Sequence, residues 1–463
     1  MFTLDQCGKY KITVRKLART LADAGHDVRV IAVLSDTTEP YEESDGARIF
    51  RLALNPVHVR VLRLISSVVR FEKKLFSSIL RESSQSPPRA DVDGAPVNSP
   101  QNTAGASLEN DTGNGRYQAG GFASVFSPLE LIHKLLYMVV RWPITKLPHA
   151  YLGYIDYYYR SFRVARQEPV DVYHAHDLVT LPVAWLCSRL AKGKLVYDSH
   201  ELWLDRPEKQ RSRFNRFFVK SIESFLIQRT DANIIAGESS GIDLSERYCI
   251  APPTVVLNVP SYRPFERSTI FRDKLGIPAS ERIILYMGRI SYLRGIEEEV
   301  QSLKYLSNCR LVIFGFGPEQ YISGLRKLIG NEGLAGRVHF FDAVSFDEVT
   351  RYAMSADIGL VLHQNTGLNY YYVSPNKLFE CMAAGLPVVG SNFPDLKKYI
   401  EGYNLGVTCD PESPKDIAEA IDYILSDETR YNEMRKNALE AAKVFNWENE
   451  SKKLVALYQG LTD

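Results

Sequence analysis

Polar residues that could bind an anion open a short and otherwise apolar helix that we expect from residue 375 onward. Ser374 is a favoured N-cap residue and Pro375 suits the first helical position. Asn376 and Lys377 then lie in the first turn, where unpaired backbone amides attract phosphate. Glu380 follows one turn later on the same face. A cation and amides for a diphosphate, with a carboxylate for two sugar hydroxyls, suit a nucleotide. A capped helix with a surface Lys–Glu pair is the plainer alternative.

Two further stretches could contact the same kind of ligand. A buried strand is expected to end at Gly288, and Arg289 and Arg294 flank the loop that follows. Guanidinium groups bind diphosphate oxygens in bidentate fashion and stabilise a departing diphosphate, although solvated surface arginines are the structural alternative. Gly315 and Gly317 let the backbone approach a ligand where a strand meets a helix, and a tight turn explains them equally well.

Histidines and acids gather at the ends of two neighbouring expected strands. The first group is Asp171, His174, His176 and Asp177, and the second is Asp198, His200 and Glu201. Imidazole and carboxylate groups are metal ligands, but this spacing matches no compact ligand motif, so we expect no metal. A histidine beside a reacting sugar is the favoured interpretation, and hydrogen bonds between loops explain the others.

These side chains require elements that bring them together, and the sequence predicts two sets of alternating strands and helices. The expected strands are 28–34, 170–176, 194–200 and 232–237 in the first set, and 282–288, 310–315, 338–342, 358–363 and 387–391 in the second. Continuous Val, Ile and Leu strands between helices indicate parallel sheets that are covered on both faces. We therefore predict an α/β protein with two doubly wound, Rossmann-like domains facing a cleft. Ligands in such folds bind beyond the carboxyl ends of the strands, where the polar residues gather.

The domain boundaries follow from composition. Residues 1–257 should form the first domain, on the acceptor side. Within it, 82–124 is rich in Ser, Gly, Asn and Pro and is predicted to be a disordered insertion. Residues 258–266 hold two prolines without periodicity and are expected to be a linker. A second domain should cover 267–440, and 441–463 should form a helix that packs back toward the first domain.

Composition excludes several classes of protein. Lys and Arg number 56 against 55 Asp and Glu, a formal charge of +1 that gives no support to nucleic-acid binding. Six scattered cysteines without ligand spacing suggest reduced structural thiols. The most apolar run outside the expected cores, 135–140, is far short of the about 20 residues that cross a membrane. We expect a cytoplasmic protein.

Seven stretches in order resemble the GT-B glycosyltransferases of the family 4 type, the retaining enzymes that use nucleotide sugars. They are LARTLADAGHDVRVIA, DVYHAHD, LVYDSHEL, VVLNVP, YMGRISYLRG, VIFGFGP and SPNKLFECMAAGLPVV. The resemblance covers nearly the whole chain apart from 82–124. Each stretch alone is weakly specific, and the seven in sequence are strongly so.

The resemblance implies a role for each matching residue. Arg289 and Arg294 would hold the donor diphosphate, although the family usually has lysine at the second position. Residues 374–377 would contact the diphosphate and the sugar, and Glu380 would accept the ribose hydroxyls. His200 matches the histidine that contacts the transferred sugar near its reactive carbon. Gly288, Gly315 and Gly317 would lie on the donor side as well.

Two departures from the family pattern stand out. Tyr372 replaces a glutamate that the family often has eight positions before the helix glutamate. The N-terminal glycine loop is reduced to Gly8, and residues 1–10 hold at most a stub of the strand before it. The natural start therefore lies upstream, or the first sheet is incomplete. On the acceptor side the candidates are Gly8, His174, Asp177 and Glu201.

The expected function is transfer of a sugar from a UDP- or GDP-type nucleotide sugar to an acceptor hydroxyl, with retention and without a cofactor, in polysaccharide or glycolipid biosynthesis. The acceptor is a glycan, a lipid-linked sugar or a small molecule. Residues 134–146 mix aromatic, aliphatic and cationic side chains; packing on the first sheet is favoured over a peripheral membrane contact. A non-catalytic GT-B subunit and a sugar-nucleotide epimerase are the rival interpretations.

Overall fold

The computed structural model describes residues 1–3, 12–35, 38–54, 149–206 and 212–462. The chain divides into two compact units, Met1–Leu54 with Tyr157–Asp463, and Asn55–Asp156. Everything below concerns the first unit. Gly8, the insertion predicted at 82–124 and the stretch 134–146 all lie outside the described residues.

The first sheet is built around the N-terminal residues. Its strands are β1 (Val28–Val33), β2 (Tyr41–Ser44), β3 (Ala47–Leu52), β4 (Val172–His176), β5 (Lys194–Ser199), β6 (Ala232–Ile235) and β7 (Thr254–Val255). Phe2 bridges Ile31 of β1 and Ala175 of β4, and its amide donates to the carbonyl of His174 at 2.8 Å. The order is therefore β2-β3-β1, residues 1–3, then β4-β5-β6-β7, parallel except for β2. The expected strand stub is present.

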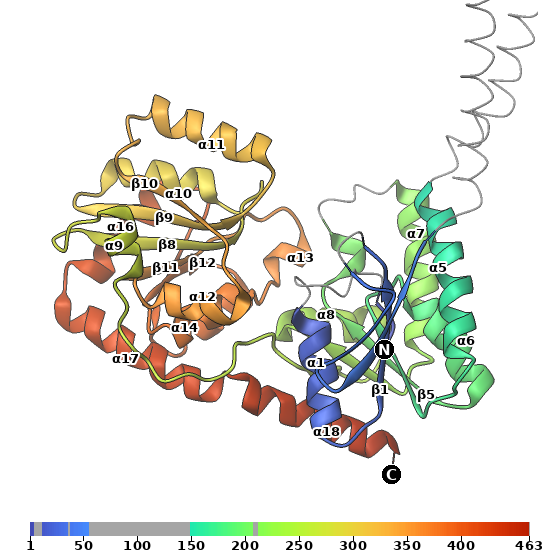
Figure 1. The fold of residues 1–463 in the computed structure, drawn as a ribbon. Coiled ribbons are helices and arrows are strands. Elements are labelled where there is room, and N and C mark those ends of the chain that lie inside the picture. Colours follow the sequence, from blue (N-terminus) through green and yellow to red (C-terminus); the bar gives the residue numbers. More distant parts are fainter. Residues whose placement is uncertain (4–11, 36–37, 55–148, 207–211, 463) are drawn as a thin grey trace, which may run out of the picture. The chain divides into compact units, whose positions relative to one another are not determined.

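Helices cover this sheet on both faces. They are α1 (Ile12–Asp23), α6 (Leu181–Ala191), α7 (Arg213–Ile227), α8 (Glu238–Tyr248) and the part of α5 (His149–Ala165) that follows Asp156. Helix α1 packs on β1 and β3, and α6 packs on β4 and β5 (Figure 1). The apolar side of α1 meets the strands in one core that includes Val14, Leu17 and Leu21.

The second sheet has the order β10-β9-β8-β11-β12-β13, and all its pairings are parallel. Its strands are β8 (Arg282–Arg289), β9 (Cys309–Phe316), β10 (Val338–Asp342), β11 (Ile358–Val361), β12 (Val388–Ser391) and β13 (Gly406–Cys409). Its helices are α9 (Ile270–Leu275), α10 (Ile296–Ser302), α11 (Glu319–Asn331), α12 (Phe346–Ala353), α13 (Leu368–Tyr371), α14 (Asn376–Ala383), α15 (Pro394–Ile400), α16 (Pro414–Leu425) and α17 (Glu428–Val444). Separate apolar cores lie on its two faces, as a doubly wound sheet requires.

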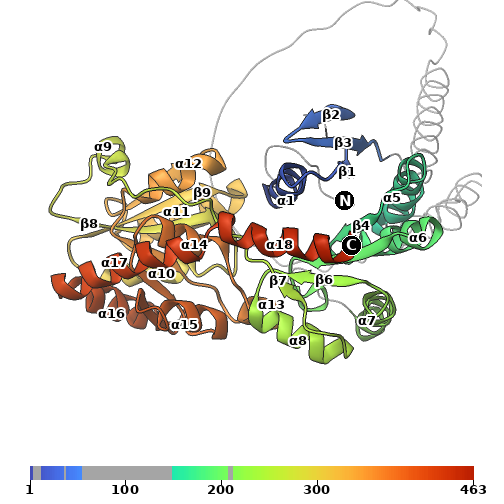
Figure 2. The ribbon, with the colours of Figure 1, turned by 90° about the horizontal axis from the view of Figure 1, so that it is seen from below.

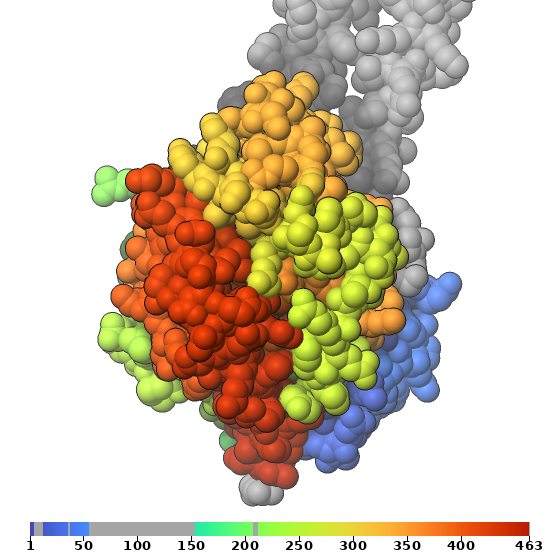
Figure 3. Space-filling model, turned by 90° about the vertical axis from the view of Figure 1, so that its left-hand side faces the viewer, coloured from blue at the N-terminus to red at the C-terminus, as the bar shows by residue number. Residues whose placement is uncertain are grey.

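Residues 258–266 contain neither helix nor strand, and the last helix, α18 (Trp447–Thr462), runs beside them. The amide of Trp447 donates to the carbonyl of Pro260 at 2.9 Å, and the amide of Leu257 donates to Glu450 at 2.8 Å. Figure 3 shows the red C-terminal helices beside the yellow-green linker. Helix α18 then packs against α1 (Figure 2), which ties the end of the chain to the first sheet.

The antiparallel hairpin of β2 and β3 was not predicted. Asp45 and Gly46 form its two-residue turn with φ of 55° and 73°, which matches the Asp-Gly signal of a tight hairpin. Strand β2 has only four residues, three of them polar, and both its faces are largely exposed. The hydrophobic pattern that reveals buried strands is therefore missing there.

Candidate active site

A cavity of about 550 Å³ lies at the carboxyl ends of both sheets, where open α/β sheets bind ligands. Nine predicted site residues line it: His200, Glu201, Gly288, Arg289, Arg294, Ser374, Pro375, Asn376 and Lys377. Gly315, Gly317, Glu380, His174 and Asp177 do not line it, and Gly8 lies outside the described residues. The structure thus brings together stretches almost two hundred residues apart in the chain.

The arginines reach the cavity because β8 ends there. Its residues from Ile283 to Met287 are buried, Gly288 has a φ of 122°, and the strand ends at Arg289, which still pairs with Phe316 of β9. Arg289 is exposed, and its carbonyl accepts a hydrogen bond from the Tyr286 hydroxyl at 2.5 Å. Nη1 of Arg294 lies 3.5 Å from Nε2 of His363. Both arginines line the cavity, and among the contacts of the described residues neither guanidinium group pairs with a carboxylate.

Gly315 and Gly317 have a packing explanation. A Cβ on Gly315 would lie 1.7 Å from the carbonyl oxygen of Gly288, and one on Gly317 would lie 2.0 Å from that of Ile290. The ends of β8 and β9 approach too closely for any side chain. A donor contact of these two glycines remains a prediction.

Helix α14 begins at Asn376, one residue later than predicted, and its N-cap is Pro375. The prediction of Ser374 as N-cap was wrong because its hydroxyl donates instead to the carboxylate of Asp395, at 2.8 Å. No side chain caps the helix. Its first amides therefore face the cavity wall without a side-chain acceptor, which favours an anion there.

Lys377 and Glu380 are both buried, so the alternative of a surface Lys–Glu pair is wrong. The Lys377 ammonium donates to the carbonyl of Leu362 at 3.4 Å and lies 4.8 Å from the centre of the Tyr286 ring. Burial lowers the pKa of Lys377 to about 8, although Glu299 acts in the opposite direction. Because little water screens a buried ammonium group, its electrostatic attraction to an incoming anion is strong.

Glu380 is a buried residue of α14, one turn after Asn376, and it does not line the cavity. Its carboxylate accepts a hydrogen bond from the Thr350 hydroxyl. Burial raises the pKa of Glu380 to about 7, and the Thr350 hydrogen bond and Lys16 lower it in part. Because the side chain does not line the cavity, its contact with a ribose remains a prediction.

The histidines of the first sheet form one cluster around Asp198. In the β4–β5 pairing His176 lies opposite Asp198, and Oδ2 of Asp198 is 3.4 Å from His174, 3.2 Å from His176 and 3.6 Å from His200. Nδ1 of His176 lies 3.0 Å from Nε2 of His200, and the Tyr458 hydroxyl lies 2.7 Å from Nδ1 of His174. Of the three histidines, only His200 lines the cavity.

Charge in this cluster is concentrated on the carboxylate. Burial lowers the pKa of His176 to about 3 and also lowers that of His174. Burial opposes ionisation of Asp198, but the charge of His200 and hydrogen bonds from the other histidines hold its pKa well below the usual value. Ligand atoms of His174, His176 and Asp198 all lie within 4.8 Å of one another, closer than the sequence spacing suggested. The absence of a metal remains a prediction.

The two remaining acidic candidates have protein partners. Glu201 pairs with Arg206 and accepts a hydrogen bond from Asn369 of α13 at 2.7 Å. Asp177 has a positive φ of 63°, its amide donates to the carbonyl of Asp198, and its carboxylate lies 3.8 Å from Arg206. These contacts position loops at the rim of the cavity.

Sequence reasoning missed several cavity residues. His363 follows the buried strand β11 at the same edge that holds Arg289, so the carboxyl-end rule could have found it. Asn258 of the linker and Trp447 of α18 also line the cavity. Asn258 lies in the stretch VVLNVP, to which sequence reasoning gave no role, and Trp447 comes from a segment without a motif.

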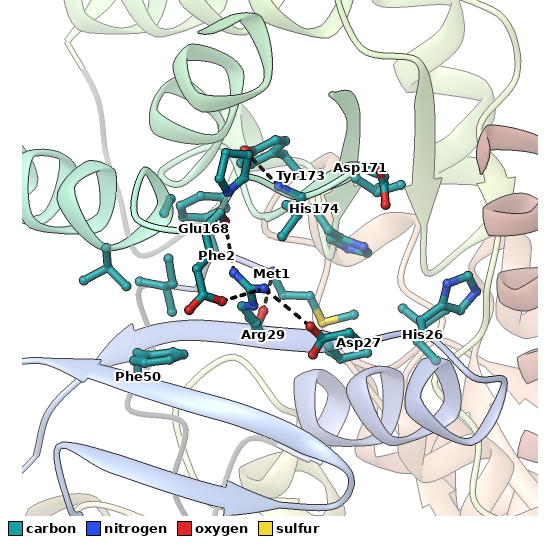
Figure 4. A pocket seen from close by; sticks show the side chains of 18 of the residues that line it. Met1, Phe2, His26, Asp27, Arg29, Phe50, Glu168, Asp171, Tyr173 and His174 are labelled. Atoms are coloured by element: carbon teal, nitrogen blue, oxygen red, sulfur yellow. Dashed lines mark hydrogen bonds and ion pairs between the residues drawn. The ribbon is translucent and has the colours of Figure 1, made fainter. Parts of the chain in front are cut away.

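A second cavity, of about 270 Å³, borders the other end of the first sheet (Figure 4). Arg29 lies there between Glu168 at 2.7 Å and Asp27 at 3.4 Å, and the N-terminal ammonium of Met1 donates to the carbonyl of Arg29 at 2.7 Å. Its main charged groups thus pair with one another, in contrast to Arg289 and Lys377 in the larger cavity.

Comparison with known proteins identifies the family. The model for glycosyl transferases group 1 matches residues 267–441, and that for the glycosyl transferase 4-like domain matches residues 128–259. A D-inositol 3-phosphate glycosyltransferase of Corynebacterium urealyticum is 28% identical over 314 residues, 63% of this chain and 72% of that protein. The chain is a GT-B glycosyltransferase of the family 4 type.

Solved structures agree on the fold of this glycosyltransferase. Sucrose-phosphate synthase from Thermosynechococcus elongatus has a TM-score of 0.69 at 17% identity, over 100% of this chain and 98% of that one. Anabaena HepE in complex with UDP-glucose has a TM-score of 0.56 at 19% identity, over 66% of this chain and 82% of that one. Among the described residues, no helix is long and apolar enough to cross a membrane.

Proposed function

We propose that this glycosyltransferase moves a sugar from a UDP- or GDP-type nucleotide sugar to an acceptor hydroxyl with retention of configuration. One observation carries the proposal: a single cavity has Arg289, Arg294, Lys377 and the uncapped start of α14 on one side, and His200 on the other. Three cations and helix amides suit a diphosphate. The UDP-glucose complex of the similar HepE supports a donor of this kind.

In this proposal the bond between the sugar carbon and the diphosphate oxygen breaks as the acceptor oxygen attacks the same carbon. The two arginines and Lys377 stabilise the negative charge that the diphosphate gains. Two carboxylates line the cavity beside His200, those of Asp198 and Glu201. Glu201 is already paired with Arg206 and Asn369, and Asp198 faces three imidazoles, so both are poor nucleophiles. Attack on the same face, with the acceptor proton passing to the leaving phosphate oxygen, follows.

His200 is the proposed contact to the transferred sugar. Its ring is half-buried and reaches the cavity, while Asp198 and His176 contact its Nε2 from behind. The sugar hydroxyls would then meet a ring whose orientation is fixed before binding. Tyr372 also lines the cavity, in place of the glutamate that the family often has, and backbone groups near it would take over the sugar contact.

The acceptor is a glycan, a lipid-linked sugar or a small molecule, and the site is cytoplasmic. The name of the Corynebacterium relative, which acts on D-inositol 3-phosphate, favours a small or phosphorylated acceptor. A lipid-linked acceptor would require that the protein visit a membrane surface. Synthesis of a polysaccharide or glycolipid is the pathway we propose.

Incubation with a panel of UDP and GDP sugars, with and without candidate acceptors, tests the proposal by nucleotide release. We expect release with one donor and its loss in Arg289→Ala. The matched control is Lys436→Ala, which removes an exposed cation of α17 outside the cavity and should keep activity. Conversion of the donor sugar without any acceptor would indicate an epimerase instead, and no release with any donor would contradict the proposal.

A further inference from the structure

Helix α7 exposes four phenylalanine side chains to solvent, an unusual number of large apolar side chains for one helix. Phe214 is 80% exposed, Phe217 70%, Phe218 50% and Phe225 46%. Single exposed apolar residues need no explanation, but a contiguous group marks a surface that contacts something.

The four rings share one face of the helix. At 3.6 residues per turn they fall within about a third of its circumference. Lys220 and Arg213 follow on one side of that stripe, and Arg229 follows just beyond the last turn on the other side. All three cations are exposed. We call these four phenylalanines and three cations the α7 patch.

Packing of the helix does not require the α7 patch. The opposite face is buried through Leu226, Ile227 and Glu223. Glu223 is the single acid between residues 212 and 229, and it accepts hydrogen bonds from Tyr197 at 2.9 Å and Tyr248 at 2.7 Å. The helix therefore has two apolar faces, one packed against the rest of the protein and one exposed to solvent. The exposed face is flanked by basic side chains and carries no acidic side chain.

Helix α6 continues this surface. Trp185 of α6 contacts the Phe225 ring, with 5.8 Å between ring centres, and α6 lies beside α7 (Figure 1). Leu186, Leu190 and Arg189 of α6 are exposed. Residues 181–194 contain no acid. Aromatic, aliphatic and basic side chains thus extend over two neighbouring helices.

We propose that the α7 patch docks on an anionic lipid surface. Phenylalanines flanked by basic side chains are the composition of helices that lie in the membrane interface, where rings enter the acyl boundary and cations meet anionic headgroups. A second copy of the chain is a poorer occupant, because a two-fold contact would bring the flanking cations of the two copies together. Docking itself involves no residue of the donor cavity, so it does not depend on the proposed chemistry. Its biological role, to bring the enzyme to a lipid-linked acceptor, rests on the proposed function.

Sedimentation of the full chain with lipid vesicles tests this surface. We compare phosphatidylcholine vesicles with vesicles that also hold about 30% phosphatidylglycerol, since anionic headgroups attract basic residues near the surface. The wild-type protein should bind the anionic vesicles and bind them more weakly at high salt. Phe214→Ser with Phe217→Ser should reduce binding at least tenfold, and Lys220→Glu should reduce it on its own.

The matched control exchanges two exposed tyrosines of the second half, Tyr305→Ser with Tyr423→Ser, and should leave vesicle binding unchanged. Circular dichroism and the donor-induced shift in melting temperature show that each variant is folded with an intact cavity. Equal binding by the phenylalanine variant, or no binding of the wild-type protein to anionic vesicles, would overturn the inference. Loss of a dimer in the phenylalanine variant would instead assign the patch to a second copy. Activity on a soluble acceptor is measured separately, so a failure of docking is distinguishable from a failure of the proposed chemistry.

Discussion

Lys377 holds its charge in a buried position, and this has opposite consequences for ligand binding and for stability. Its pKa is about 8 in the folded protein and ordinarily 10.5. Between these values the unfolded chain binds more protons than the folded one, so Lys377 makes the free energy of unfolding rise with pH there. A diphosphate needs the protonated ammonium, so its affinity falls over the same range.

We therefore predict that UDP or GDP affinity, measured by calorimetry, declines as the pH rises above 8. In Lys377→Gln the affinity should be lower at pH 7, and the decline above pH 8 should largely vanish. Lys436→Gln is the control and should behave as the wild type. An unchanged pH profile in Lys377→Gln would show that the lysine does not meet the phosphates.

Asp198 lines the cavity beside His200, and its carboxylate also contacts His174 and His176 behind it. Asp198→Asn keeps a side chain of similar shape but removes the negative charge that faces three imidazole rings. We predict that kcat falls by about tenfold or more while the donor KM changes little, as expected when an orienting partner is lost. The pH profile of kcat should also shift. Asp171→Asn, an exposed acid directly before the neighbouring strand β4, is the control. Equal effects of the two substitutions would indicate that Asp198 has only a structural role.

At the scale of elements, the ends of β8 and β9 decide where Arg289 points. Gly315→Ala would place a methyl group 1.7 Å from the Gly288 carbonyl, which forces the strands apart. Overpacking of this kind costs about 1–3 kcal/mol. We predict a lower melting temperature and a loss of nucleotide binding, since the arginine loop moves with the strand.

Gly324→Ala is the matched control, because nothing lies within 4 Å of a Cβ at that position of α11. Alanine in a helix interior is favoured over glycine by about 0.5–1 kcal/mol, so this variant should be slightly more stable and bind nucleotide normally. Normal binding in Gly315→Ala as well would contradict the role given to this strand contact.

The buried strands could be predicted because short apolar runs such as Ile283–Met287, followed by glycine, favour buried strands over helices. Parallel strands also put their carboxyl ends at one edge of the sheet. That rule placed Arg289, Lys377 and His200 in a common cavity. The cap of α14 could not be predicted, since Asp395, which takes the Ser374 hydroxyl, lies on another helix. The hairpin at Asp45 was missed because β2 has only four residues and no buried side chain. Tertiary partners, rather than local propensity, decided both cases.

At the scale of the whole unit, hydrogen bonds join the halves around the cavity. Asp395 of α15 accepts from Ser374 and from the amide of Ser239, which belongs to α8 beside the first sheet. Asn369 of α13 likewise accepts from the amide of Leu202 at 2.9 Å and donates to Glu201. These contacts hold His200 opposite the donor residues.

Asp395→Asn should therefore reduce the free energy of unfolding by about 1–3 kcal/mol, the cost of weakening a buried charged hydrogen-bond acceptor. Because the donor is proposed to bind mainly on the second half, we predict a larger loss in kcat than in donor affinity. Asp422→Asn, an exposed acid of α16, should change neither. Equal loss of donor affinity and kcat in Asp395→Asn would contradict this division of roles.

The most direct test of the cavity is titration of the protein with UDP and GDP by calorimetry, in the wild type, Arg289→Ala, Arg294→Ala and Lys436→Ala. We predict that one of the two nucleotides binds, that each cavity arginine variant weakens it at least tenfold, and that Lys436→Ala binds as the wild type does. No binding of either nucleotide, or equal weakening in all three variants, would contradict the assignment of this cavity to a nucleotide sugar.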